Sequence, residues 1–247
     1  MEPPEVRRGH ITVNVASTFG EFYGEWVDRH RELTELMFQA VQQRVTGSRV
    51  DRDSDRKDLI QEVMSHYKRY FEKKAEAARQ DVFIFFSPPW MSTLERTLLW
   101  LGEFKPSMVF RFVDATVKDL TEDQRERIEQ VSTWARREER ALTSRMATVQ
   151  ESVAAPPVLG VLRGMGRKEL DGEQDSLVEQ VTGRLRAAML DLMMTADELR
   201  GTTVGEVVHV LRTDQSLAVL AAVGRFQVEM RRRGLERDAP RGDVGAN

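Results

Sequence analysis

The chain has 247 residues, 40% of them hydrophobic and 31% charged, so it can bury a core of its own without a metal or a disulfide. Its 37 basic and 40 acidic residues give a formal net charge of −3, which excludes a globally basic nucleic-acid binder but not a local basic patch. The absence of cysteine excludes disulfides and thiolate chemistry, and without a secretory signal or a membrane-spanning apolar run the protein is expected to be intracellular.

Apolar residues recur at intervals of three and four between clusters of glycine and proline, a pattern that predicts an all-α fold. A first helix is expected over 18–45 and a second over 55–79, separated by a polar turn. Residues 81–86 have strand-like composition, but no second strand is found to pair with them, so a buried helical turn or an extended core segment is favoured. Ser92 and Glu95 form a capping box that opens the next helix.

The helices that follow also begin at recognisable caps. Pro106 suits the first turn of one helix, and Thr121 with Gln124 caps the longest, over about 122–153. Residues 154–176 contain four glycines and two prolines and are expected to form a mobile loop.

Three more helices are expected, over 176–199, 203–211 and 214–232. Ser176 with Glu179 opens the first of them, Thr203 with Glu206 opens the second, and Asp214 caps the last. We therefore predict a single-domain bundle of seven to nine helices. Its parts are an N-terminal tail (1–16), a helical domain (17–233) and a C-terminal tail (234–247).

The sequence offers no residue set for catalysis. None of the histidines (His10, His30, His66 and His209) has the spacing of a metal motif, so structural or surface roles are favoured, although an axial haem ligand stays open. The glycines of 160–166 lack the context of a phosphate-binding loop. Glu138 and Glu139 lie in an arginine-rich run and are expected on a solvated ion-pair face. No cofactor is expected.

One string of residues departs from a generic helical pattern. Its members are His66, Tyr67, Tyr70, Lys74, Asp81, Pro88, Pro89, Trp90, Glu95, Arg96, Trp100, Gly102, Pro106 and Ser107. This string resembles the plant delay-of-germination (DOG) domain, which also occurs behind the basic zipper of TGA transcription factors. Further matching blocks, such as Phe19-x-x-Phe22-x-x-x-Trp26 and Leu120-Thr121-x-x-Gln124, extend the resemblance to about residues 17–233.

The chain departs from this family in two respects. The domain begins within about 17 residues of Met1, which leaves no room for a basic zipper, so we expect the TGA element that reads DNA to be absent. In the family motif Trp-x-Gly-Gly-x-Arg-Pro-Ser, Glu103 replaces the second glycine and Lys105 the arginine. Glycine permits a positive φ that an acid rarely adopts, so this turn is expected to differ in shape from that of the family.

The resemblance implies a non-enzymatic plant developmental regulator that acts through protein–protein interaction, in pollen aperture formation or in seed dormancy. One alternative is a transcription-associated regulator with sequence-specific DNA binding, as in TGA factors, and another is a module that senses a ligand such as haem. Implied partners are other proteins, among them another DOG-domain protein, a kinase or a second copy, with DNA contacted only weakly or indirectly. A cytoplasmic or nuclear location is implied, or recruitment to the inner face of the plasma membrane.

The motif residues are expected to be mainly structural. We expect Trp90 and Trp100 to be buried together, and Glu95 with Arg96 to form an ion pair that fixes helix orientation. The candidate partner-binding surface is polar and exposed. It comprises Glu103, Lys105, Arg231, Arg232 and Arg233. For the three arginines, a favourable interaction with the dipole at the end of the last helix is the simpler explanation.

Overall fold

A computed structural model of the chain describes residues 4–42, 49–153 and 172–239. Over these ranges it contains seven α-helices, one short 3-10 helix and no strand, which confirms the predicted all-α fold. The elements are α1 (Pro4–Gln42), α2 (Arg49–Gln80), η1 (Phe83–Phe85), α3 (Thr93–Arg96), α4 (Met108–Thr116), α5 (Glu122–Val153), α7 (Gly172–Val210) and α8 (Thr213–Asp238).

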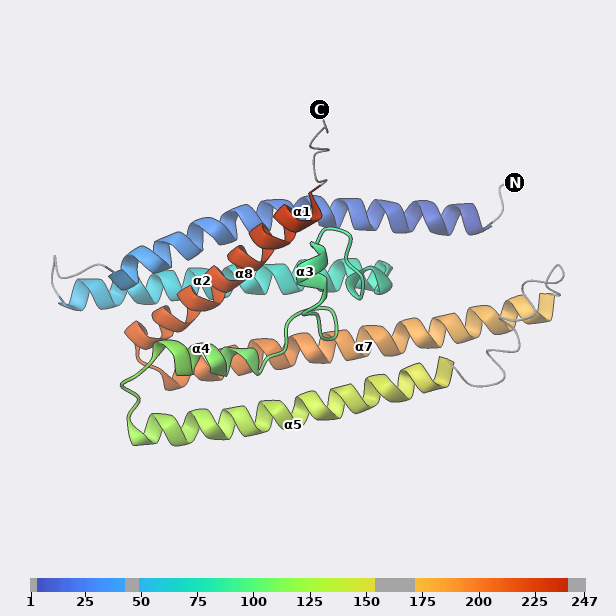
Figure 1. Ribbon diagram of the computed structural model, residues 1–247. Helices are drawn as coiled ribbons and strands as arrows, with labels where there is room; N and C mark the ends of the chain where they lie inside the picture. Colours follow the sequence, from blue (N-terminus) through green and yellow to red (C-terminus); the bar gives the residue numbers. More distant parts are fainter. Residues whose placement is uncertain (1–3, 43–48, 154–171, 240–247) are drawn as a thin grey trace, which may run out of the picture.

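The long helices form two antiparallel pairs, α1 with α2 and α5 with α7, and α8 crosses obliquely between them (Figure 1). Helix α8 packs against α1, α2, α3 and α4 and also contacts α7, so it joins the two pairs into one bundle. Within the described ranges, no helix is both long enough and apolar enough to cross a membrane.

The buried face of α1 shows why the sequence folds this way. Six residues spaced alternately by four and three positions point to the core: Phe19, Tyr23, Trp26, His30, Leu33 and Met37. This spacing keeps side chains on one side of a helix of 3.6 residues per turn. The same face passes from an aromatic cluster near Phe19 to an aliphatic cluster near Met37, where α8 supplies Leu217 and Leu220.

Several local predictions are confirmed. Helix α5 has the predicted bounds, and Thr121 and Gln124 cap it reciprocally, with N···O distances of 3.1 and 3.2 Å. The capping box of Ser92 and Glu95 is formed. The apolar run after Asp81 contains a 3-10 turn, as favoured over a strand.

Other helix limits differ from the expectation. Helix α1 begins at Pro4, although residues up to 16 were expected to be a tail, and α8 continues beyond Arg232 to Asp238. Helix α3 is a single turn that ends at Arg96. The expected mobile loop falls mainly on residues 154–171, which lie outside the described ranges.

The expected break between two helices near residue 200 is wrong, because α7 is continuous there. The Thr203 hydroxyl donates to the carbonyl of Leu199, at 2.7 Å, instead of capping a new helix. Threonine inside a helix commonly bonds back to the carbonyl four residues earlier. The pattern read as a capping box is therefore an internal helical contact.

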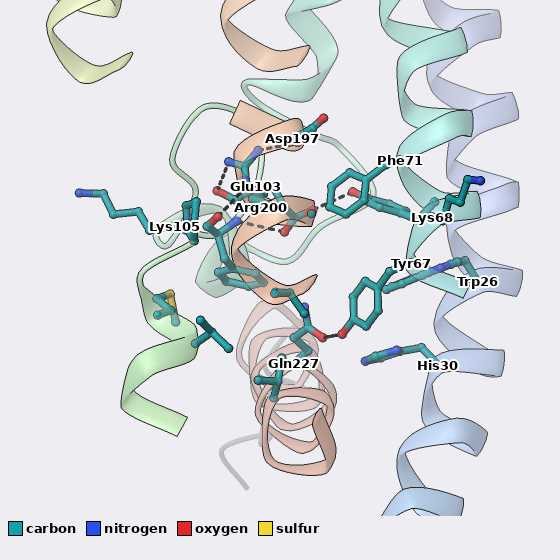
Figure 2. Close-up of a pocket in the computed structure, with 18 of the residues that line it drawn as sticks. Trp26, His30, Tyr67, Lys68, Phe71, Glu103, Lys105, Asp197, Arg200 and Gln227 are labelled. Carbon is teal, nitrogen blue, oxygen red and sulfur yellow. Dashed lines mark hydrogen bonds and ion pairs between the residues drawn. The ribbon is translucent and has the colours of Figure 1, made fainter. Parts of the chain in front are cut away.

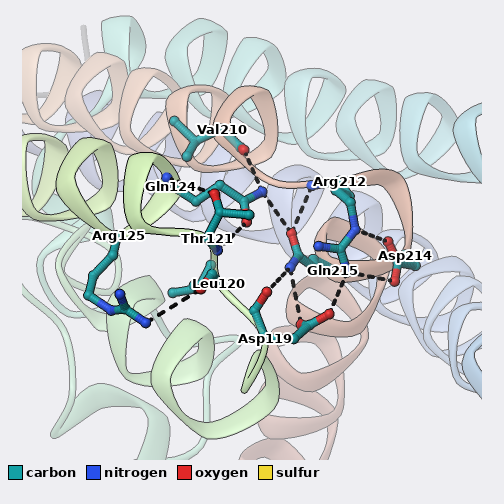
Figure 3. A network of polar contacts seen from close by, with 9 residues as sticks. All are labelled: Asp119, Leu120, Thr121, Gln124, Arg125, Val210, Arg212, Asp214 and Gln215. Carbon is teal, nitrogen blue, oxygen red and sulfur yellow. Dashed lines mark hydrogen bonds and ion pairs between the residues drawn. The ribbon is translucent and has the colours of Figure 1, made fainter.

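Two buried glutamines fasten α5, α7 and α8 where α7 turns into α8 (Figure 3). The Gln124 amide donates to the carbonyl of Val210, at 3.0 Å, and to Oε1 of Gln215, at 2.9 Å. The same oxygen of Gln215 accepts from the backbone N–H of Arg212, so Gln215 caps α8 where Asp214 was expected to do so. The Gln215 amide in turn reaches Asp119, at 3.1 Å.

Candidate functional site

A cavity of about 910 Å³ lies among α1, α2, α4, α7, α8 and the turn that precedes α4 (Figure 2). Its wall on α2 includes Met64, Tyr67, Phe71 and Ala75, which recur every three or four residues and so share one helical face. Aromatic rings and flexible methionines dominate the apolar lining. Such surfaces adapt to ligands of varied shape.

The polar base of the cavity begins with Tyr70 and Glu103. The Tyr70 hydroxyl donates to Oε2 of Glu103 at 2.8 Å, and both residues are buried. Burial, reinforced by the charge of Glu103, raises the pKa of Tyr70 well above its usual value, so the hydroxyl remains a donor. Glu103 is thus an interior residue, and the prediction that it belongs to an exposed partner surface is wrong about its exposure.

The turn that carries Glu103 explains why an acid fits at the family's second glycine. Leu101 and Gly102 have positive φ values of 49° and 80°, and Trp100 and Glu103 exchange backbone hydrogen bonds of 2.7 and 3.3 Å. This is the pattern of a tight turn with two left-handed central residues. Among the residues described, positive φ is confined to these two, so position 103 needs no glycine.

Arg200 holds this turn against α7. Its guanidinium donates to the backbone carbonyls of residues 100, 101, 103 and 104, the last at 2.7 Å. It also pairs with Asp197, whose other cationic partner is Lys74, at 2.9 Å. Lys74 is completely buried, and burial lowers its pKa while Asp197 opposes that shift. Two cations and one carboxylate therefore form a closed internal network.

Arg231 is also directed inward, unlike the exposed residue that was expected. Its guanidinium lies 3.1 Å from the carbonyl of Trp90, 3.5 Å from Oε2 of Glu95 and 5.0 Å from the centre of the Tyr23 ring. Glu95 therefore pairs with Arg231 and not with Arg96, which is exposed and contacts Thr93. The expected ion pair between neighbours in sequence is wrong, because consecutive residues of a helix point in different directions.

The other members of the expected surface are exposed. Arg232 and Arg233 pair with Glu229, at 2.6 and 2.5 Å, and Lys105 lies at the edge of the cavity, over the Trp100 ring. Only this part of the predicted patch is accessible to a partner in the described structure.

Three nearly parallel rings lie together beside the cavity. Trp26 stacks on His30 and on His66, with ring centres 4.8 and 4.7 Å apart. Burial is the main cause that lowers the pKa of each histidine to about 4, so both are neutral near pH 7. Both nitrogens of His30 and Nε2 of His66 lack a hydrogen-bond partner among the described residues.

Sequence reasoning did not single out His30 as a cavity residue. The available signal was its position, four residues after Trp26 on the apolar face of α1. Gln227 was also missed; its side chain accepts a hydrogen bond from Tyr67 of α2 across the cavity (Figure 2).

The two tryptophans of the motif lie in different parts of the core, so the expectation that they pack together is wrong. Trp90 belongs to the aromatic cluster of Phe19 and Phe85, with ring centres 4.8 and 5.3 Å away. Trp100 instead donates to Thr143 of α5. The positive-φ turn after Trp100 directs the chain toward α5 and α7, away from Trp90.

The remaining motif residues have structural contacts. Asp81 accepts from the backbone of Phe83 at 3.0 Å, Pro88 and Pro106 are buried, and Pro89 is exposed. Ser107 donates through its N–H and its hydroxyl to Glu139, at 2.6 and 2.9 Å.

The expectation that both acids of the arginine-rich run are solvated is therefore half correct. Glu139 is buried against Ser107, whereas Glu138 pairs with Arg137 at the surface. In the ranges that the structure covers, no group of three or more histidine or acidic residues is arranged to hold a metal ion.

The fold and the cavity define an all-α bundle whose buried charged groups are held by ion pairs or hydrogen bonds within the described ranges. A family model described as seed dormancy control (DOG1) matches residues 33–115. Protein ZW2 of Arabidopsis thaliana is 36% identical over 224 residues, which cover 89% of this chain and 97% of that protein. Arabidopsis RESPONSE TO ABA AND SALT 1 is 36% identical over 226 residues, covering 90% and 97%, respectively. Rice transcription factor TGA2.3 is 28% identical over 219 residues, covering 88% of this chain and 64% of the factor. The chain belongs to the DOG1 family.

Proposed function

We propose that the protein is a non-enzymatic plant regulator that acts through protein–protein interaction, in seed dormancy or in the response to ABA and salt. The observation that carries the proposal is its 36% identity to RESPONSE TO ABA AND SALT 1 over nearly the full length of both chains. The family description adds seed dormancy control. These names support dormancy and stress regulation more directly than pollen aperture formation.

The interior chemistry supports a role without catalysis. Arg200, Asp197 and Lys74 hold one another and the turn before α4, and Arg231 is held by Glu95 and a carbonyl group. An acid–base catalyst needs a titratable group within reach of a substrate. The charged groups of the interior described above instead bind one another or backbone carbonyl groups.

Partner binding then falls to the exposed cations, Arg232 and Arg233 with Lys105. We expect Arg232→Glu with Arg233→Glu to leave thermal stability nearly unchanged, because both pairs are exposed. The double variant should lose the partners that the wild-type protein captures from seed extract, identified by mass spectrometry. Arg136→Glu with Arg140→Glu, two exposed residues of α5, is the control of equal charge change.

Undiminished capture by the folded double variant would contradict this docking surface. Tight, steeply salt-dependent DNA binding by the wild-type protein would favour the transcription-associated alternative instead. A fluorescent fusion tests the proposed cytoplasmic or nuclear location, and recruitment to the plasma membrane is the alternative outcome.

A second proposed function is the sensing of a small ligand, and the observation that favours it is the cavity of about 910 Å³. This volume is near the upper end of the range of small-molecule sites. Haem is one candidate because His30 lines the cavity. Titration with haem, followed by its absorbance band, tests that candidate in the wild-type protein and in His30→Phe.

A further inference from the structure

We infer that the cavity binds an electrically neutral, mainly apolar small molecule whose hydroxyl or amide group is held at the Tyr67–Gln227–His30 end. The inference rests on the proposed sensing function and specifies the class of ligand. Haem, with its two anionic propionates, falls outside this class. Its support comes from three independent features of the cavity: its wall, its charges and one uncommitted polar residue.

The wall requires an apolar body. Trp26, Phe71 and Phe226 contribute rings, and Met64, Met108 and Met194 contribute flexible thioether side chains. A molecule that covers these groups gains roughly 25 cal/mol for each Å² of apolar surface removed from water. A largely polar molecule, such as a sugar or a nucleotide, would lose its hydration without compensation here.

The charges disfavour an anion. Five cations line the cavity. Lys68, Arg79 and Lys105 are exposed to solvent, where a pair with a ligand carboxylate contributes little. Arg200 and Arg231 are the two that are directed inward, and protein acceptors already occupy both. The ammonium of Lys74 is buried against Asp197 and does not line the cavity. A ligand carboxylate at Arg231 would leave Glu95 buried without its cation, at a cost of several kcal/mol. At Arg200 it would have to displace Asp197, which would keep only Lys74, and the carbonyl groups of the turn.

A cationic ligand is disfavoured for the corresponding reason. Asp197 binds two cations, Glu95 binds Arg231, and Glu103 accepts from Tyr70 and interacts with the charge of Lys74, so each of these three carboxylates is already compensated. The other acids of the lining, Glu72, Glu76, Asp191 and Glu198, are exposed to solvent. A neutral ligand leaves all of these pairs intact.

One polar residue beside the cavity remains uncommitted. His30 is 3% exposed, and neither of its nitrogens has a hydrogen-bond partner in the described part of the chain. A neutral imidazole offers one donor and one acceptor. Gln227 lies next to His30, but its carbonyl accepts from Tyr67 and its side chain closes no hydrogen bond of normal geometry to either nitrogen of His30 (Figure 2).

A hydroxyl or an amide group of a ligand would complement His30 and Gln227. Each of these groups both donates and accepts, so it can satisfy the imidazole and the Gln227 amide together, and the charge of the site does not change. A buried polar group without a partner costs about 1–3 kcal/mol, which a ligand of this class would recover on binding.

The test uses two fluorescent probes of nearly equal size, neutral 1-pyrenebutanol and anionic 1-pyrenebutanoate. Binding to the full chain at pH 7 is followed by fluorescence anisotropy. We expect the alcohol to bind at least tenfold more tightly than the carboxylate. In His30→Phe, which keeps an aromatic ring but removes both nitrogens, affinity for the alcohol should fall several-fold while affinity for the carboxylate changes little. His209→Phe, at an exposed position outside the cavity, is the matched control.

A second variant guards against a folding defect in His30→Phe. Gly201 lines the cavity, and a Cβ atom added there meets no other atom within 4 Å. Gly201→Trp should therefore fold and obstruct the cavity, so that neither probe binds. Thermal melting checks the fold of every variant.

Three results would overturn the inference. Equal or tighter binding of the carboxylate would refute the neutral class but leave ligand sensing standing. Binding of neither probe, or binding that Gly201→Trp does not affect, would also remove the ligand-sensing function. Unchanged affinity of a folded His30→Phe for the alcohol would refute the polar end of the site.

Discussion

The hydroxyl of Tyr70 and the carboxylate of Glu103 are joined by a buried hydrogen bond of 2.8 Å between residues 33 positions apart. Through it, the middle of α2 fixes the turn that precedes α4. The acid at the family's second glycine therefore acts inside the protein, as the acceptor for the Tyr70 hydroxyl. The chain has replaced backbone freedom at this position with a specific interaction.

Restoring the family glycine should destabilise the protein. Glu103→Gly leaves the buried Tyr70 hydroxyl without its acceptor, and we expect the free energy of unfolding to fall by about 1–3 kcal/mol in urea titrations. Glu103→Gln keeps an acceptor oxygen and should cost less. A glycine variant as stable as the wild-type protein would show that the hydrogen bond contributes nothing.

The network of Lys74, Asp197 and Arg200 predicts unequal effects of removing its members. Asp197→Ala leaves two buried cations uncompensated and should cost about 3–5 kcal/mol. Lys74→Met removes one cation, fills a similar volume and leaves the pair of Asp197 and Arg200 intact, so its cost should be clearly smaller. Chemical unfolding of both variants measures the difference. The reverse order would mean that Lys74 is the anchor of the network.

The two histidines stacked on Trp26 predict a loss of stability in mild acid. Their pKa is lowered from 6.5 to about 4 in the folded protein. Between these values the unfolded chain binds more protons than the folded one. The free energy of unfolding should therefore decrease as the pH falls from 6.5 toward 4, by up to about 1.4 kcal/mol per pH unit for His30.

Thermal melting at a series of pH values checks this prediction. His30→Phe should flatten the pH dependence, whereas His209→Phe, an exposed control, should retain the wild-type curve. A melting temperature that stays constant from pH 7 to pH 4.5 would contradict the assignment of two buried neutral imidazoles.

The glutamine pair at the junction of α7 and α8 predicts a coupled loss. Gln215→Leu removes the acceptor for the backbone N–H of Arg212 and for the Gln124 amide, so about 1–3 kcal/mol of stability should be lost. Gln124→Leu should cost a similar amount, and the double variant less than the sum, because the two residues share one hydrogen bond. Strict additivity in a double-mutant cycle would argue against this network.

Much of the helical framework could be predicted because its signals are local. The bounds of α5 follow from a capping box and a regular apolar repeat, and the 3-10 turn after Asp81 follows from the lack of a pairing strand. The prediction of helix limits was wrong where the same local pattern occurs both at the start of a helix and inside one. Thr203 and Glu206 have the spacing of a cap, but packing against neighbouring helices keeps α7 continuous.

The site was harder to predict because its polar residues depend on distant parts of the chain. Arg231 lies in a run of three arginines that looks uniformly exposed in the sequence. Because successive side chains of a helix point in different directions, Arg231 faces Glu95, which lies 136 residues away in the sequence. Glu103 has its partner 33 residues away. The direction in which such a side chain points is set by tertiary packing, which residue spacing does not encode.

The position of α8 has a consequence for synthesis of the protein. This last long helix packs on α1, and its Asp238 accepts a hydrogen bond from the backbone of Thr93. A ribosome therefore releases α1 and its partner α2 well before α8, which packs on both, exists. The bundle can close only after α8 has been translated, so it should fold more slowly than helices that pack only on their immediate neighbours in sequence.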